Sequence, residues 1–385
     1  MGLVDAFALY VHWPWCVRKC PYCDFNSHAI TREVDEAAYI DALLDDLEGS
    51  WELSGERTVT SVFFGGGTPS LMTPIGFYRL MSGIGERVKL SEDCEITMEA
   101  NPGTLEQNKF KSFADAGVNR FSIGIQSFDD VYLKRLGRIH TAAQAHQAVE
   151  AALKCVDNVN LDVMYALPGQ SLADMQKDVN TALSKGTTHL SFYELTIEEG
   201  TAFAKRVPEN LPEGDDAADM SEWIWKATKE AGFEHYEISG YAKPQRRCLH
   251  NLTYWTFGDY LGIGAGAHGK ITRNGEILRT IRRANPFLYM DDAAQRRFPT
   301  QVHSVQTCDY AFEFMLNALR LLDGVPTRLW EQRTGLPLST IASTLQELKA
   351  EGLLVNTEER IVATELGQRF LSDIQERFLS TDVDE

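Results

Sequence analysis

Three cysteines near the start of the chain have the spacing of a metal centre. Cys16, Cys20 and Cys23 form the pattern Cys-x3-Cys-x2-Cys. A structural zinc ion normally takes four protein ligands, and no fourth Cys or His follows at zinc-finger spacing. An iron-sulfur cube has four irons and tolerates one without a thiolate, so three cysteines leave one iron open to an exogenous ligand. The spacing therefore favours a [4Fe-4S] cluster.

A second group of residues has the character of a small-molecule site. Residues 65–67 are three glycines after an apolar run, and glycines let the backbone approach a ligand and aim its N–H groups at a carboxylate or phosphate. Glu99 ends another apolar run, where its carboxylate can accept hydrogen bonds from ribose hydroxyls. Asp162 stands among apolar neighbours, and a buried carboxylate needs partners. Asp162 is therefore either a satisfied structural group or a ligand.

The third group lies in the run Cys248-Leu-His250-Asn251-Leu-Thr-Tyr254-Trp255. A single histidine is more often a structural residue than a ligand. His250 is followed by two large aromatic residues, however, and a flat iron-bearing macrocycle needs an imidazole for its metal and aromatic walls for its faces. The run is therefore a candidate macrocycle site, in which Cys248 is the weaker candidate for an axial ligand.

Alternating strands and helices must position these groups. The apolar pattern predicts six strands, over residues 7–11, 61–64, 95–102, 121–128, 160–164 and 189–195. Helices are expected between them, over residues 34–47, 105–116, 141–155 and 171–185. This alternation favours a parallel α/β sheet, and polar residues recur where the strands end, as in barrel active sites. A doubly wound open sheet has a similar pattern, so periodicity alone leaves both architectures open.

The pattern changes after residue 195, and the tail forms a separate module. A helix is expected over residues 217–231, and two more over residues 309–322 and 339–350. Residues 352–355 and 360–363 read as a two-stranded wing, so the tail resembles a winged-helix domain. Its many acidic residues favour a lid or a protein-docking module over DNA binding. We expect a core over residues 1–240, a barrel-closing segment over 241–299 and the tail module over 300–385.

Composition restricts the class of partner and the compartment. The chain has 37 basic and 55 acidic residues, for a net charge of −18, which disfavours a nucleic-acid partner because lysine and arginine drive phosphate binding. No apolar run reaches the length of a membrane span, and the first residues carry no basic n-region. We therefore expect a cytoplasmic protein with reduced cysteines.

The motifs together resemble those of a known family. They are Tyr10-Val-His-Trp-Pro-Trp-Cys16, Gly-Gly-Gly-Thr-Pro-Ser, Met98-Glu-Ala-Asn-Pro, Gly124-Ile-Gln-Ser-Phe, Arg138-Ile-His and His250-Asn-x-x-Tyr-Trp255. In this order they are similar to the HemW-like radical S-adenosylmethionine (SAM) heme chaperones, relatives of the oxygen-independent coproporphyrinogen III oxidase. The resemblance covers nearly the whole chain. It implies an incomplete (β/α)6 barrel with a winged-helix-like C-terminal module.

The resemblance also implies cofactors and their ligands. The cysteine triplet would bind the cluster with Tyr22 nearby, and the open iron would be chelated by SAM and could cleave it reductively. The first SAM would contact Tyr10, Gly66 and Glu99. The oxidase relatives hold a second SAM, and the positions that match its pocket are Gly67, Thr68, Gln126, Arg138 and Asp162. Heme would be held by His250, Asn251, Tyr254 and Trp255.

One departure separates the two related functions. The oxidase has a further cysteine two residues after the triplet, where this chain has Phe25. This difference and the His250 motif favour a chaperone that delivers heme to apo-hemoproteins such as respiratory enzymes. The alternatives are an oxidase that makes protoporphyrinogen IX by radical decarboxylation, and a scaffold with a purely structural cluster. The resemblance further implies an electron donor for the cluster, and the tail module offers a surface for a homodimer.

Overall fold

A curved sheet of six parallel strands forms the centre of the computed structural model, which describes residues 6–55, 57–299 and 301–380. The strands are β1 (Phe7–Trp13), β4 (Val59–Gly66), β5 (Leu90–Ala100), β6 (Arg120–Gln126), β7 (Asn158–Tyr165) and β8 (His189–Glu194). They pair in the order β1-β4-β5-β6-β7-β8, and every neighbouring pair is parallel. The six strands expected from the sequence are all present.

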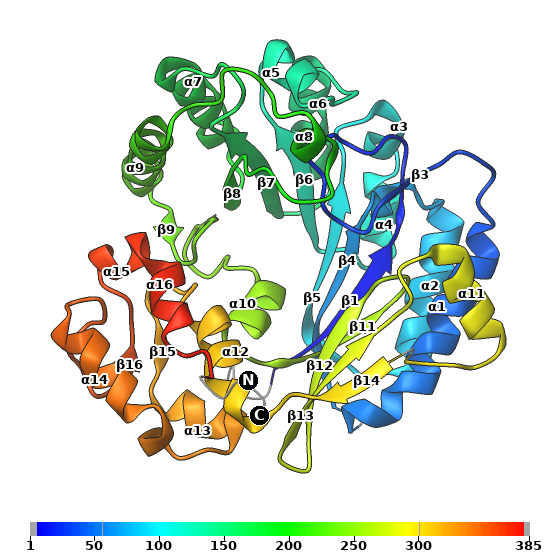
Figure 1. The fold of residues 1–385 in the computed structure, drawn as a ribbon. Helices are drawn as coiled ribbons and strands as arrows, with labels where there is room; N and C mark the ends of the chain where they lie inside the picture. Colours follow the sequence, from blue (N-terminus) through cyan, green and yellow to red (C-terminus); the bar gives the residue numbers. More distant parts are fainter. Residues whose placement is uncertain (1–5, 56, 300, 381–385) are drawn as a thin grey trace.

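Helices cover the outer face of this sheet (Figure 1). They are α1 (Glu36–Trp51), α2 (Pro74–Arg87), α3 (Thr104–Gln107), α4 (Phe110–Asp115), α5 (Asp130–Arg135), α6 (Ala142–Leu153), α7 (Leu172–Leu183) and α9 (Gly214–Glu230), whereas α8 (Ala202–Lys205) lies beside the cysteine loop, where Phe203 N–H donates to the Pro21 carbonyl. Their starts follow local sequence rules, because Asp35, Thr73 and Thr141 accept hydrogen bonds from the first turns of α1, α2 and α6. The helix expected over residues 105–116 is divided between α3 and α4.

Further strands continue the sheet past both ends of the parallel core. β11 (Asp259–Ile263) pairs in parallel with β1, and β12 (His268–Arg273), β13 (Glu276–Ile281) and β14 (Gln301–Ser304) follow in antiparallel order. On the other side, β8 pairs with β10 (Gly240–Ala242), and β10 pairs with β9 (Glu234–His235). Within the described ranges β1 and β8 do not pair, so the barrel is incomplete, as predicted.

The C-terminal part has its own hydrophobic core. It contains α12 (Tyr310–Ala318), β15 (Val325–Pro326), α13 (Arg328–Thr334), α14 (Ala342–Ala350), β16 (Arg360–Ile361), α15 (Glu365–Arg369) and α16 (Leu371–Glu376). The expected wing is different, because β16 pairs with β15, and residues 352–355 contribute only the single bridge Leu354–Ala363. Backbone hydrogen bonds of 2.9 Å flank that bridge, from Val355 N–H to the Val362 carbonyl and from Thr364 N–H to the Leu353 carbonyl, so the expected pairing is present but short.

Of two further short helices, the first lies against the C-terminal module and the second packs on the barrel. Helix α10 (Leu249–Trp255) lies between the sheet and the C-terminal module (Figure 1), and α11 (Pro286–Ala294) packs against α1. The domain boundaries at residues 240 and 299 stay a prediction. None of the helices in the described ranges is long and apolar enough to span a membrane.

Candidate functional site

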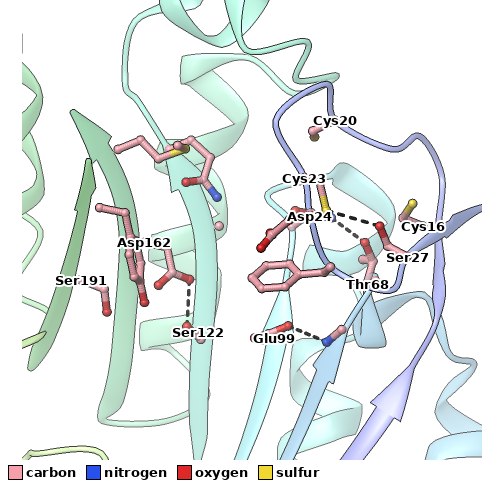
Figure 2. A pocket seen from close by; sticks show the side chains of 18 of the residues that line it. Cys16, Cys20, Cys23, Asp24, Ser27, Thr68, Glu99, Ser122, Asp162 and Ser191 are labelled. Carbon is pink, nitrogen blue, oxygen red and sulfur yellow. Dashed lines mark hydrogen bonds between the residues drawn. The ribbon is translucent and has the colours of Figure 1, made fainter. Parts of the chain in front are cut away.

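One cavity of about 520 Å³ occupies the interior of the curved sheet. Side chains of all six parallel strands line it, the cysteine loop lies at one end, and α10 lies at the other. In Figure 2 the loop with the cysteines faces Asp162, Ser122 and Ser191 across the cavity, and Glu99 lies between them. Of the residues predicted from the sequence, the cavity brings together all but Gly65, Trp255 and the weaker candidate Cys248, whose Sγ instead donates to Glu95 Oε1 at 3.5 Å.

Hydrogen bonds close the cysteine loop at its base and anchor it to the segments that follow β11 and β13. The short strands β2 (Trp15–Cys16) and β3 (His28–Ala29) pair in parallel on either side of it. Asn26 also anchors the loop, because its side-chain amide donates at 2.9 Å to the carbonyls of Ala265 and Ala284. The loop is therefore fixed by contacts that are far apart in the sequence.

The three thiols of the loop line the cavity wall. Burial, together with the neighbouring thiols of Cys23 and Cys20, raises the pKa of Cys16 to about 11. Ser27 Oγ lies 3.3 Å from Cys23 Sγ, and Arg138 Nη1 donates to Cys20 Sγ at 3.5 Å. No three ligand side chains in the described part of the chain already surround a single-ion site. Three thiols on a cavity wall, one of them beside a guanidinium, are a donor set that fits an iron-sulfur cluster.

The glycine-rich segment braces this loop through backbone hydrogen bonds. Gly66 N–H donates to Glu99 Oε2 at 3.0 Å, Gly67 N–H to the Trp13 carbonyl at 2.7 Å, and Thr68 N–H to the Trp15 carbonyl at 2.8 Å. These three donors bond within the protein, and the part of the segment in ligand binding stays a prediction. A Cβ on Gly67 would lie 2.5 Å from the Trp15 carbonyl oxygen, so the close approach to the cysteine loop requires glycine.

Glu99 and Asp162 are two buried carboxylic acids in the cavity. Burial, reinforced by the charge of Asp162, raises the pKa of Glu99 to about 8. Burial also raises the pKa of Asp162. The oxygens of Asp162 accept hydrogen bonds of 2.9 Å from Ser122 Oγ and Asn160 Nδ2. Asp162 thus has structural partners and also faces the cavity, so the two interpretations of this residue are compatible.

Arg138 and Gln126 occupy the rim beside the cysteine loop. Arg138 Nη2 donates to Asn101 Oδ1 at 2.6 Å and to the Gly124 carbonyl at 2.8 Å, so its guanidinium links the strand ends to Cys20. Gln126 has a φ of 66° where the pairing of β6 with β7 becomes irregular. This left-handed conformation is unusual for a residue other than glycine and often marks functional sites.

The His250 motif forms the opposite end of the cavity. His250 is 1% exposed; its Nδ1 lies 3.0 Å from Ser61 Oγ, and its Nε2 lies 2.7 Å from the Tyr254 hydroxyl. The rings of Phe63 and Tyr254 lie 5.0 and 4.8 Å from the imidazole. Trp255 points elsewhere, with the Arg320 guanidinium 4.2 Å from its ring. The helical spacing places Trp255 on the face of α10 that packs against the C-terminal core.

The sequence interpretation missed several polar residues of the cavity. They are Asn101, Arg120, Ser122, Asn160, Ser191 and Tyr193. The signal for two of them, Arg120 and Ser122, is the alternation along residues 120–126, in which Arg, Ser, Gly and Gln face the cavity while the apolar residues between them are buried in the core. Such a period of two is typical of a strand with one polar face.

Comparison with known proteins identifies the class. The model of the radical SAM superfamily matches residues 10–182, and that of the HemN C-terminal domain matches residues 306–370. The solved structure of HemN, the coproporphyrinogen III oxidase of Escherichia coli, superimposes with a TM-score of 0.81 at 20% identity, over 98% of this chain and 91% of that one. This likeness confirms the fold. The fold is that of a radical SAM protein.

Relatives in sequence define the family within that class. Heme chaperone HemW of Escherichia coli (strain K12) is 44% identical over 99% of this chain and 100% of the relative. Heme chaperone HemW of Bacillus subtilis (strain 168) is 35% identical, with coverages of 96% and 98%. A mitochondrial radical S-adenosyl methionine domain-containing protein 1 of Mus musculus is 36% identical, with coverages of 90% and 81%. The chain belongs to the HemW-like family of radical SAM proteins.

The raised pKa of Glu99 predicts that SAM binding depends on pH. At pH 6.5 a carboxyl with a pKa of about 8 is mostly protonated, and it loses its proton as the pH rises. If SAM binds beside Glu99, as the resemblance implies, its ribose hydroxyls would then gain a charged acceptor. The affinity for SAM should increase on the order of tenfold between pH 6.5 and 8.5. Equilibrium binding to the cluster-loaded protein under anaerobic conditions measures this change.

The matched control is Glu99→Gln, which keeps the shape of the side chain and cannot ionise. Its affinity for SAM should vary less with pH than that of the unaltered protein. The other groups that face Glu99 are Asp162, Arg120, Tyr10 and the Gly66 N–H, and they remain in the variant. An unchanged pH profile in Glu99→Gln would assign the dependence to another group or to SAM itself.

Proposed function

We propose that this chain is a heme chaperone that binds a [4Fe-4S] cluster, SAM and heme, and delivers heme to apo-hemoproteins such as respiratory enzymes. The observation that carries the proposal is the place of His250, which faces the same cavity as the three cysteines. Membership of a family whose bacterial relatives are named heme chaperones supports it.

The state of His250 suits an iron ligand. Burial, together with the charge of Arg120, lowers the pKa of His250 to about 3, so the ring is neutral at physiological pH, which is the form that binds metals. On heme binding, the Nε2 atom of His250 would release the Tyr254 hydroxyl and bind the heme iron instead. Nδ1 would keep its bond to Ser61 Oγ and so hold the orientation of the ring, as partners of metal-bound histidines do.

The other end of the cavity suits the cluster and SAM. We assign three irons to Cys16, Cys20 and Cys23, and the first SAM to Tyr10, Gly66 and Glu99. When bound there and reduced, such a cluster would supply the one electron that cleavage of the sulfonium of SAM requires. Tyr10 has a positioning role, because its hydroxyl lies 3.0 Å from His12 Nδ1, and His12 Nε2 lies 2.9 Å from the Asn26 carbonyl in the cysteine loop.

A second SAM would lie beside Gly67, Thr68, Gln126, Arg138 and Asp162. Several polar atoms of these residues are already engaged, since Thr68 Oγ1 accepts from Asn101 Nδ2 at 2.8 Å and Arg138 bonds to Asn101 and Gly124. The proposal includes an electron donor for the cluster and apo-hemoproteins as acceptors. The homodimer stays a prediction.

An anaerobic heme titration of the cluster-loaded protein, followed by visible absorbance, tests the chaperone function. We expect saturable one-to-one binding in the unaltered protein and an affinity at least about tenfold lower in His250→Ala, because the iron loses its ligand. His303→Ala is the matched control, since His303 is exposed on β14. Transfer of the bound heme to an apo-hemoprotein is the following step.

Two results would contradict the proposal. The first is heme binding that does not depend on His250. The second is formation of vinyl-bearing product from coproporphyrinogen III in the presence of SAM and a reductant, which would favour the oxidase. Phe25, at the position of the additional oxidase cysteine, is 63% exposed, and Phe25→Cys tests whether that thiol alone confers decarboxylation.

A further inference from the structure

A buried arginine in the cavity has no hydrogen-bond or ion-pair partner among the described residues. Arg120 lies on β6, lines the cavity and is 2% exposed. In the described part of the chain its side chain has no hydrogen bond and no ion pair, and its Nε is buried without an acceptor. A buried guanidinium normally has its donors paired, because an unpaired buried charge is costly.

The acidic groups around Arg120 are engaged with other donors. Glu95 accepts from the His250 N–H at 3.2 Å and from Cys248 Sγ at 3.5 Å. Asp162 accepts from Ser122 and Asn160. Both acids stabilise the charge of Arg120 electrostatically from beyond ion-pair distance. The fork of the guanidinium therefore remains available to a ligand.

The position of Arg120 indicates which ligand groups it can meet. It lies near His250, since its charge acts on that imidazole, and it faces the same cavity as Glu99 and Asp162. The net charge of the chain is −18, so the positive charge of Arg120 inside the barrel is unlike the charge of the chain as a whole. It favours the binding of an anionic ligand group.

We propose that Arg120 binds a carboxylate of a ligand in the barrel, either a propionate of the porphyrin held at His250 or the carboxylate of a SAM molecule. The inference rests on the proposed function and adds the residue that orients the ligand. A planar guanidinium matches a carboxylate with two parallel hydrogen bonds, and such charged pairs are among the strongest polar contacts. With iron at His250, one propionate bound at Arg120 would fix the rotation of the macrocycle in the cavity.

The first test uses the unaltered protein. Heme and heme dimethyl ester, whose propionates carry no charge, are titrated anaerobically against the cluster-loaded chain. If a propionate binds Arg120, the ester should bind about 10- to 100-fold more weakly, with the absorbance signature of the His250 ligand retained. This arm needs no substitution, so it does not depend on how well a variant folds.

The second test uses Arg120→Met and Arg120→Lys. Arg120→Met should bind heme as weakly as the ester and should no longer distinguish the two porphyrins, while Arg120→Lys should retain part of the difference. Arg57→Met is the matched control, because Arg57 is a partly buried arginine that pairs with Asp259 at 2.9 Å and does not line the cavity. SAM affinity is measured on the same proteins.

The results distinguish a heme propionate from a SAM carboxylate as the ligand of Arg120, and they test the role of Arg120 separately from the chaperone function. A selective loss of heme affinity assigns the propionate, and a selective loss of SAM affinity in Arg120→Met assigns the SAM carboxylate. Equal affinities of the folded variants for both ligands, with no penalty for the ester, would overturn the role of Arg120 even if heme transfer succeeds. If no protein binds heme, the chaperone function fails, and the SAM measurement alone decides the role of Arg120.

Discussion

Replacement of any one of Cys16, Cys20 and Cys23 by alanine will abolish assembly of the [4Fe-4S] cluster. The three cysteines would bind three of the four irons of the cluster. The loss of one thiolate would therefore leave two irons without a protein ligand. The iron and sulfide content after anaerobic reconstitution should fall close to background, and reductive formation of 5′-deoxyadenosine should disappear with it. Iron analysis, visible absorbance and electron paramagnetic resonance measure the first effect, and product analysis measures the second.

Cys308→Ala is the control for this experiment, because Cys308 is exposed and lies far along the chain in the C-terminal module. Its cluster content should equal that of the unaltered protein. A full cluster in any of the three variants would show that another residue supplies the ligand. If the unaltered protein assembles the cluster but neither binds nor cleaves SAM, the cluster is a structural element and the scaffold alternative is correct.

The parts predicted well from the sequence are those governed by local pattern. The six parallel strands follow from short apolar runs that end in polar or glycine-rich residues. The three cysteines from Cys16 to Cys23 lie in one loop because they are close together in the sequence. Pattern alone left the open and barrel architectures undecided. The choice between them depends on curvature and on which strands pair, and neither leaves a local signal; here the resemblance to a family supplied it.

The features that were missed depend on contacts between distant residues. The N–H groups of Gly66 and Gly67 bond to Glu99 and to Trp13, partners that glycine content does not reveal. Trp255 belongs to the same seven-residue helix as His250 but faces the C-terminal core, because α10 is buried on two sides. Arg120 could not be predicted because a basic residue at the start of a strand is usually exposed to solvent. Only the three-dimensional fold places its side chain inside the barrel.

A contact between residues far apart in the sequence also fixes the segments around β11 to β14 to helix α1. Asp46 on α1 is fully buried and pairs with Arg282, which follows β13, at 3.0 Å. Its carboxylate also accepts from the Tyr289 hydroxyl at 2.9 Å and from the Gly264 N–H at 3.2 Å. One carboxylate thus joins α1 to three segments that are more than 200 residues away in the sequence.

Asp46→Ala will therefore destabilise the protein strongly. The substitution leaves the Arg282 charge buried without its partner, which typically costs about 3–5 kcal/mol, and the midpoint of urea unfolding followed by tryptophan fluorescence should fall accordingly. Asp41→Ala is the matched control on the same helix, because Asp41 is 57% exposed and pairs with Arg79 on the surface; its cost should stay below about 1 kcal/mol. Equal midpoints for the two variants would mean that the buried pair does not hold β11–β14 to the barrel. Because Ala265, next to Gly264, accepts the Asn26 hydrogen bond that anchors the cysteine loop, we also expect the Asp46 variant, where it still folds, to retain its cluster less well than the Asp41 variant.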